Sequence, residues 1–347
     1  MPISSTQDFF IQFHLTERCN LHCSHCYQTE EGTEELSFPE IKEFISEAAD
    51  MINAWSSLYS LSLLSSFTLT GGEPFLREDL RLIIEELRKN GLEVYLLSNG
   101  TLIDREKADM LSKLKARGVQ VSMEGPEHIH DKIRGSGSFA ASVRGVRHLL
   151  DAGLTVTLNA TLSEINADYF MDMVSIASSL GVQKLGFSRL VPSGRGRGMV
   201  GAMLSNKKVQ GLYSKIFSLK PNGLKIVTGD PIAWQTIGPP GKDAGNTPSS
   251  GCAAGVSGLT ILPDGTVTPC RRLPIPIGNV KTDSLREIWV SSPVLGSLRD
   301  RSSYKGKCGR CGNWALCRGC RAIAYACSKM DGGNDFLADD PQCFIDV

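Results

Sequence analysis

The chain has 347 residues, and its 37 lysines and arginines balance its 37 aspartates and glutamates. This balance gives no overall attraction to nucleic acid or to an anionic membrane, so a charged partner has to be bound at a local site. No stretch approaches the roughly 18 consecutive apolar residues of a transmembrane helix, and the first residues do not resemble an export signal. We therefore predict a cytoplasmic protein, with one large and one smaller domain, that binds neither nucleic acid nor a membrane.

The chain has 11 cysteines, which are grouped near its two ends. Three fall within 19–26, none lies in 27–251, and the other eight follow. Because the cytosol keeps thiols reduced, metal binding explains these cysteines better than a disulfide framework does. Two separate metal regions are therefore predicted.

Apolar runs typical of strands alternate with stretches of helical periodicity. The predicted strands are 9–14, 66–70, 94–98, 119–123, 155–160 and 184–190, and the predicted helices are 37–58, 79–90, 104–117, 138–152 and 166–180. Ser37 and Glu40 predict a capping box that opens the first helix. Strand-helix units of this kind imply an α/β fold, a partial (β/α)6 TIM-type barrel over 8–218 with its chemistry at the carboxyl ends of the strands.

Two further regions follow the predicted barrel. Residues 219–250 are rich in Pro, Gly and Ser and are expected to form a linker or lid. From 251 to 347 the chain consists of short segments separated by cysteines, too small to be stable without cross-links or metal. We expect a small cysteine-rich domain there.

Cys19, Cys23 and Cys26 lie in the loop directly after the first predicted strand. Three thiolates from one short loop can hold three irons of a [4Fe-4S] cluster and leave the fourth iron open to another group. Zinc is the alternative, but a structural zinc site takes four protein ligands and catalytic zinc sites rarely use three cysteines from one loop. The spacing therefore favours an iron-sulfur cluster.

The segment CNLHCSHCYQ, which ends in Tyr27 and Gln28, resembles the signature of the radical S-adenosylmethionine (AdoMet) superfamily. The segment TGGEP ends the second strand, where that family has its GGEP motif, and SNG and SMEG end the third and fourth strands at AdoMet-contacting positions. The segment HDKIRG resembles the family segment that supplies an arginine, here Arg134. Related enzymes commonly have Asp where this chain has Glu124, and His22 and His25 are expected to face away from the cluster.

The resemblance implies a set of site residues around one catalytic [4Fe-4S] cluster. The cluster would be held by Cys19, Cys23 and Cys26, and AdoMet by Tyr27, Gly71, Gly72, Glu73, Pro74, Ser98, Asn99, Ser122 and Arg134. Glu73 would meet the methionine ammonium group, while Ser122 and Arg134 would hold the carboxylate. An electron from a donor such as flavodoxin or ferredoxin would then cleave AdoMet to a 5′-deoxyadenosyl radical.

The C-terminal cysteines resemble those of the SPASM domain, which binds two auxiliary [4Fe-4S] clusters. Carried over by position, the first cluster would be held by Cys252, Cys270 and Cys320, and the second by Cys308, Cys311, Cys317 and Cys343. The first set lacks an evident fourth thiolate, and the spacing before Cys320 is one residue shorter than in many members. Cys327 is interpreted as a packing thiol rather than a ligand. A zinc site is the alternative for the region 308–320.

Two substrate classes fit this resemblance. The leading hypothesis is a maturase that forms a thioether-type crosslink in a ribosomally made peptide, and the alternative is tetrapyrrole side-chain modification or decarboxylation in haem d1 or alternative haem synthesis. A formylglycine maturase is disfavoured because Arg271 stands where those enzymes carry an acidic base. A non-enzymatic iron-sulfur carrier is the remaining class, and it has no use for the barrel motifs.

The partner of a peptide substrate is a further open point. About eight residues precede the first strand, so a leader peptide would be bound by a separate protein, by the linker or by the barrel rim. Arg195 and Arg197 are candidates to meet an acidic leader or a porphyrin carboxylate, although a solvated glycine-rich turn explains them equally well. Asp230 is a candidate to face the substrate.

Overall fold

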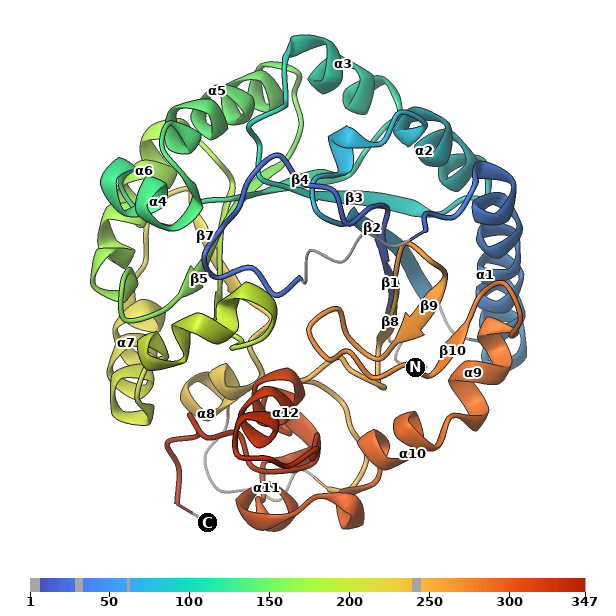
Figure 1. Ribbon diagram of the computed structural model, residues 1–347, viewed down its shortest axis with the longest axis vertical. Helices are drawn as coiled ribbons and strands as arrows, with labels where there is room; N and C mark the ends of the chain where they lie inside the picture. The colour runs from blue at the N-terminus through green and yellow to red at the C-terminus, as the bar shows by residue number, and fades with distance from the viewer. Residues whose placement is uncertain (1–6, 29–33, 61–62, 239–244, 347) are drawn as a thin grey trace.

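The structure is a computed structural model that describes residues 7–28, 34–60, 63–238 and 245–346. Its strands form one sheet in the order β10-β9-β8-β1-β2-β3-β4-β5-β6-β7. Figure 1 shows the sheet curving into an open barrel with helices outside it, while the C-terminal elements, in orange and red, lie between the first and last strands of the curve. The prediction of a partial barrel with a cysteine-rich C-terminal region is confirmed.

All six predicted strands are present, and each is parallel to its neighbour. They are β1 (Gln7–His14), β2 (Leu63–Thr70), β3 (Glu93–Ser98), β4 (Gly118–Ser122), β5 (Val156–Leu162) and β6 (Lys184–Arg189). The helices between them are α1 (Phe38–Tyr59), α2 (Leu80–Lys89), α3 (Arg105–Lys113), α4 (Glu127–Arg134), α5 (Ser138–Asp151) and α6 (Phe170–Leu180). The predicted capping box at Ser37 and Glu40 is present at the start of α1.

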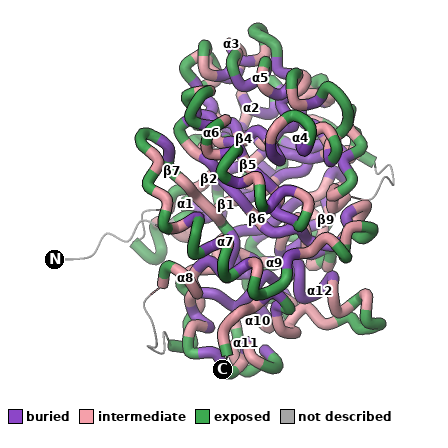
Figure 2. The backbone as a smooth tube through the Cα atoms, turned by 90° about the vertical axis from the view of Figure 1, so that its left-hand side faces the viewer, coloured by how far each residue is buried: buried purple, intermediate pink, exposed green. Residues whose placement is uncertain are grey.

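Apolar and polar side chains alternate along the strands, so that the apolar core lies on one face of the sheet and the barrel interior on the other. In β5 the apolar residues Val156, Leu158 and Ala160 are fully buried, whereas Asn159 and Thr161 are partly exposed. Successive side chains of a strand point to opposite faces, so one face packs against the helices and the other faces inward. Figure 2 shows the buried strands in purple beneath a more exposed outer layer.

The parallel sheet continues past residue 218, which corrects the expected extent of the barrel. Helix α7 (Asn206–Ser218) leads to β7 (Lys225–Thr228), which pairs in parallel with β6. This strand lies in the stretch that was expected to be a linker or lid. Its four residues are too few to show periodicity, and the Pro- and Gly-rich flanks hide it. Part of the expected linker, 239–244, lies outside the described residues.

The C-terminal region extends the same sheet from the opposite edge. Strand β8 (Gly258–Ile261) pairs in parallel with β1, and β9 (Thr266–Thr268) and β10 (Gly278–Asn279) follow antiparallel. The buried side chains of β8 and β9 belong to the same apolar core as those of β1. Packing against the barrel core therefore stabilises this region, in addition to any metal bound by its cysteines.

Short helices complete the C-terminal region. They are α8 (Trp234–Ile237), α9 (Leu285–Ser291), α10 (Pro293–Arg299), α11 (Gly306–Arg310) and α12 (Arg321–Met330). Within the described ranges, none of the helices has the length and apolar character needed to cross a membrane.

Candidate functional site

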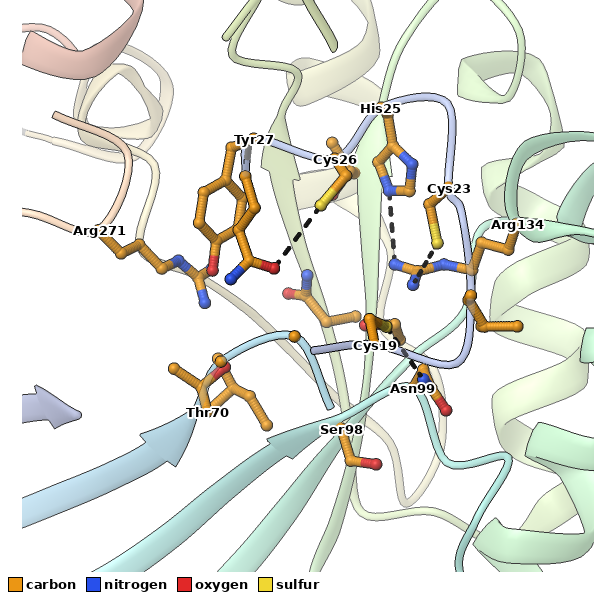
Figure 3. A pocket seen from close by; sticks show the side chains of 18 of the residues that line it. Cys19, Cys23, His25, Cys26, Tyr27, Thr70, Ser98, Asn99, Arg134 and Arg271 are labelled. Atoms are coloured by element: carbon orange, nitrogen blue, oxygen red, sulfur yellow. Dashed lines mark hydrogen bonds between the residues drawn. The ribbon is translucent and has the colours of Figure 1, made fainter. Parts of the chain in front are cut away.

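The carboxyl ends of the parallel strands open into one cavity, and the loop after β1 forms part of its wall (Figure 3). Most of the expected site residues line this cavity: Cys19, Cys23, Cys26, Tyr27, Gly71, Gly72, Ser98, Asn99, Ser122 and Arg134. Glu73 and Pro74 do not. The carboxyl ends of parallel strands lie at the same edge of a sheet, and motifs far apart in the sequence therefore come together here.

Additional polar residues line the cavity, and the sequence analysis missed them. They are Gln120, Asn159, Thr161 and Ser188, on β4, β5 and β6. Gln120 and Ser122 are two residues apart, as are Asn159 and Thr161, so each pair lies on one face of its strand. Polar residues at every second position, between apolar ones, were the signal in the sequence that could have indicated these cavity-lining residues.

The loop that follows β1 and carries Cys19, Cys23 and Cys26 is called the cysteine loop here. The backbone of the GGEP segment holds it by direct contact. The Gly72 nitrogen donates to the Thr16 carbonyl at 2.7 Å, and the Glu73 nitrogen donates to the Arg18 carbonyl at 2.8 Å. A Cβ atom on Gly72 would lie 2.0 Å from the Arg18 oxygen. Glycine is therefore required for β2 to approach the start of the cysteine loop.

The Glu73 side chain is buried beside the tip of β3. Its carboxylate is fully buried and accepts hydrogen bonds from Ser98 Oγ and the Asn99 nitrogen, both at 2.8 Å. Burial raises the pKa of Glu73 to about 7, although these hydrogen bonds oppose the shift. Because β2 and β3 are neighbours, the residue beyond the tip of β2 meets the tip of β3 rather than the cavity.

Through Asn99, Glu73 supports the cysteine loop. The Asn99 side-chain nitrogen donates to Asn20 Oδ1 at 2.9 Å and lies 3.9 Å from the Sγ of Cys19. Since Glu73 holds the Asn99 backbone, it positions the residue that contacts a cysteine. Glu73 is thus a positioning residue in this structure, and its expected contact with a methionine ammonium group stays a prediction.

Glu124 anchors Arg134 beside Cys23. Arg134 donates to Glu124 Oε1 from Nη2 at 2.6 Å and from Nε at 3.0 Å, and its Nη1 lies 3.7 Å from the Cys23 Sγ. Burial alone would raise the pKa of Glu124, but the charges of Arg134 and His25 outweigh it and hold that pKa well below its usual range. The longer acid in place of Asp therefore contacts the arginine rather than the cavity.

The two histidines of the cysteine loop differ from each other. His22 is exposed and does not line the cavity, as expected. His25 lines the cavity, contrary to expectation (Figure 3). Its Nε2 lies 3.2 Å from Glu124 Oε1. The buried Glu124 carboxylate is therefore in contact with both His25 and Arg134.

The segment after β6 also packs on the cysteine loop. The Gly196 nitrogen donates to the Cys26 carbonyl at 2.9 Å, and Arg195 Nε donates to the Cys23 carbonyl at 3.0 Å. Arg195 lines the cavity, whereas Arg197 is exposed and does not. The two arginines that the sequence grouped together are therefore separated by the structure.

Asp230 lies in a buried ionic network instead of facing the cavity. Arg189, at the end of β6, pairs with Asp230 at 2.6 Å and with Asp340 at 2.7 Å, and Tyr213 donates to Asp230 at 2.6 Å. This network connects the barrel to the C-terminal segment that precedes Cys343. Asp230 was expected to face the substrate, but two side-chain donors bind its carboxylate inside the protein and it does not line the cavity.

Arg271 and Arg272 line the cavity from the C-terminal region, and the sequence analysis did not assign them to the site. The Arg271 guanidinium lies 5.5 Å from the centre of the Tyr27 ring, and Arg272 Nη1 lies 3.4 Å from the Arg189 carbonyl. Their position directly after Cys270 was the feature of the sequence that could have assigned them to the site. A residue next to a cysteine expected to bind a cluster lies close to that cluster.

The cysteines expected to hold the second auxiliary cluster share a smaller cavity. It is lined by Cys308, Cys311, Cys317 and Cys343, together with Trp314, Arg318 and Gln235. Arg321 Nη2 lies 3.5 Å from the Cys308 Sγ, and the Gly319 nitrogen donates to the Cys317 Sγ at 3.4 Å. Donors aimed at sulfur, with four cysteines around one cavity, fit an iron-sulfur cluster.

Three of the remaining cysteines lie close together in the C-terminal region. Cys270 and Cys327 pack against the same small apolar cluster, which includes Cys320. Cys320 directly precedes α12, and Cys327 lies on that helix. The two cysteines are about two helical turns apart, a rise of about 10 Å. Burial is the largest cause that raises the pKa of Cys327 to about 11. These features fit a packing thiol at Cys327.

Comparison with known proteins identifies the family. The sequence model of the Radical SAM superfamily matches residues 13–177, and that of the SPASM iron-sulfur cluster-binding domain matches 252–321. The AdoMet-dependent heme synthase of Nitratidesulfovibrio vulgaris is 31% identical, over 96% of this chain and 91% of that protein. The mycofactocin maturase MftC of Mycobacterium tuberculosis is 29% identical, over 96% of this chain and 82% of MftC.

The fold is also that of a solved protein. The crystal structure of Streptococcus suis SuiB bound to S-adenosylmethionine matches with a TM-score of 0.75 and 15% identity, covering 98% of this chain and 78% of SuiB. At this identity the likeness concerns the fold alone. The chain is therefore a member of the radical SAM enzyme superfamily, with S-adenosylmethionine and iron-sulfur clusters as its cofactors and a SPASM domain in its C-terminal region.

Proposed function

We propose that this enzyme modifies a tetrapyrrole by removing a hydrogen atom from a carboxylate-bearing side chain. When bound, AdoMet and a [4Fe-4S] cluster on Cys19, Cys23 and Cys26 supply the 5′-deoxyadenosyl radical, which takes up that hydrogen. The cavity residues hold AdoMet and the substrate at fixed positions and exclude water from the reacting atoms. This was the alternative hypothesis from the sequence, and the cavity now favours it.

The charge of the cavity wall carries this proposal. Among the described residues that line the cavity, the charged ones are Arg134, Arg195, Arg271 and Arg272, with no aspartate or glutamate. A wall of this kind suits a ligand with several carboxylates, because arginine binds carboxylate through charge-assisted and often bidentate hydrogen bonds. A tetrapyrrole with acetate or propionate side chains has this chemistry.

The relatives support the same substrate class. The protein of N. vulgaris is named an AdoMet-dependent heme synthase, and its alignment spans nearly the whole of this chain. A pre-heme d1 synthase of Dinoroseobacter shibae is 27% identical over 96% of the chain. Both barrel and C-terminal region are therefore shared with proteins whose names concern haem synthesis.

A peptide maturase that forms a thioether-type crosslink is the second candidate. It is favoured by the likeness to the maturase MftC, and by the first auxiliary set of Cys252, Cys270 and Cys320, which offers only three thiolates. An iron left open there would suit a substrate thiolate. A separate leader-binding protein would then be a partner.

One anaerobic assay compares the two candidates. The reconstituted enzyme with AdoMet and reductant is given either an iron-coproporphyrin or sirohaem-type tetrapyrrole or a cysteine-containing peptide, and 5′-deoxyadenosine and product mass are measured. We expect tetrapyrrole-dependent 5′-deoxyadenosine together with a mass loss from the tetrapyrrole. Product formed only from the peptide would overturn the proposal in favour of the second candidate.

A further inference from the structure

Arg271 and Arg272 differ from the better-compensated arginines nearby. Arg134 is paired with Glu124, and Arg189 contacts two buried carboxylates. Arg271 and Arg272 line the cavity, yet neither forms an ion pair with a carboxylate of the described residues. Two guanidinium groups in a partly enclosed space are costly without an anion beside them.

Both side chains are nevertheless held in place. The Arg271 guanidinium lies over the Tyr27 ring, with 5.5 Å to its centre, and Arg272 Nη1 lies 3.4 Å from the Arg189 carbonyl. The Nε of Arg272 is buried without a hydrogen-bond partner in the described structure. The pair is therefore held in place at the cavity wall, and within the described structure the buried Nε of Arg272 lacks an acceptor.

The position of Arg271 separates it from the AdoMet end of the cavity. Figure 3 shows Arg134 and Arg271 on opposite sides, with the three cysteines between them. Arg134 serves the cysteine loop through its contact with Cys23. A ligand that reaches Arg271 therefore extends away from Arg134 and toward the C-terminal region.

We propose that Arg271 and Arg272 bind a carboxylate of the substrate and so decide which side chain faces the radical. This inference rests on the proposed function and deepens it, because the carboxylate is that of an acetate- or propionate-type group on a tetrapyrrole. The alternative is that the two arginines only neutralise the cluster ligands Cys270 and Cys320. The two roles differ in what is lost when the charges are removed.

The experiment measures tetrapyrrole binding to anaerobically reconstituted enzyme by absorbance titration. It compares the parent with Arg271→Gln, Arg272→Gln and Arg271→Lys, and Arg197→Gln serves as the control at an exposed arginine outside the cavity. The glutamine variants should weaken binding by about tenfold to a hundredfold, and Arg271→Lys should restore part of the loss. Iron content and the paramagnetic spectrum of the auxiliary clusters should stay unchanged.

A neutral probe completes the test. The methyl ester of the same tetrapyrrole should bind the parent as weakly as it binds the glutamine variants. Loss of iron in those variants, or equal binding of acid and ester by the parent, would overturn the inference.

Failure of the proposed function is recognised separately, by absence of tetrapyrrole-dependent 5′-deoxyadenosine in the parent. Peptides ending in a carboxylate or an amide are then titrated instead. A preference for the carboxylate that disappears in Arg271→Gln would still support the site, and no preference would refute it.

Discussion

Arg134 contacts Glu124 through two nitrogens, at 2.6 and 3.0 Å, while its third nitrogen lies 3.7 Å from the Sγ of Cys23. The acid is fully buried and also accepts from the Thr161 nitrogen at 2.8 Å. One carboxylate thus fixes the arginine that contacts the cysteine loop. The arrangement joins the tips of β4 and β5 to the loop after β1.

Removing the charge of Glu124 should leave Arg134 buried without a counterion. We expect Glu124→Gln to lower the free energy of unfolding by about 3–5 kcal/mol, the usual result of breaking a buried ion pair from one side. Anaerobic urea unfolding measures this. Glu85→Gln, in the exposed pair with Arg81, is the matched control and should cost at most about 1 kcal/mol. Equal effects of the two substitutions would show that the buried pair does not stabilise the fold.

Glu73 should make stability depend on pH. Its pKa is raised from 4.5 to about 7 in the folded protein, so between these values the folded state keeps a proton that the unfolded state has released. The contribution of Glu73 to the free energy of unfolding should therefore fall as pH rises through this range, by up to about 1.4 kcal/mol per unit. Urea unfolding of the parent and of Glu73→Gln across the range isolates it. Parallel pH profiles for the two proteins would contradict a raised pKa.

The three cysteines of the first loop should be needed for AdoMet cleavage but not for the other clusters. Three [4Fe-4S] clusters give about twelve irons per chain. Changing Cys19, Cys23 and Cys26 to alanine should remove about four of these and abolish 5′-deoxyadenosine formation. Iron analysis and chromatography of the reaction measure the two effects. AdoMet cleavage that survives in the triple variant would place the catalytic cluster elsewhere.

Cys317 and Cys327 should respond differently to substitution. Cys317 lines the smaller cavity with three other cysteines, whereas Cys327 lies on α12 and packs against a small apolar cluster. Cys317→Ala should lose about four irons, while Cys327→Ala should retain the parent's iron content and paramagnetic spectrum. A changed spectrum in Cys327→Ala would make it the fourth ligand of the first auxiliary cluster and would weaken the case for an open iron.

The sequence by itself determined the local features of this protein. Strand periodicity located β1 to β6, a capping box marked the start of α1, and cysteine spacing indicated two metal regions. Each of these depends on residues close together in the chain, so a short window contains the whole signal. The family resemblance likewise rested on contiguous motifs.

Tertiary structure decided the rest, because it depends on which strands become neighbours. Pairing of β2 with β3 turned Glu73 to the tip of β3, and pairing of β8 with β1 brought the C-terminal region into the barrel's sheet. The same pairing brought Arg271 to the wall of the cavity at the strand ends. A side chain's partners across such pairings lie tens to hundreds of residues away, and only the packing of one shared core brings them together.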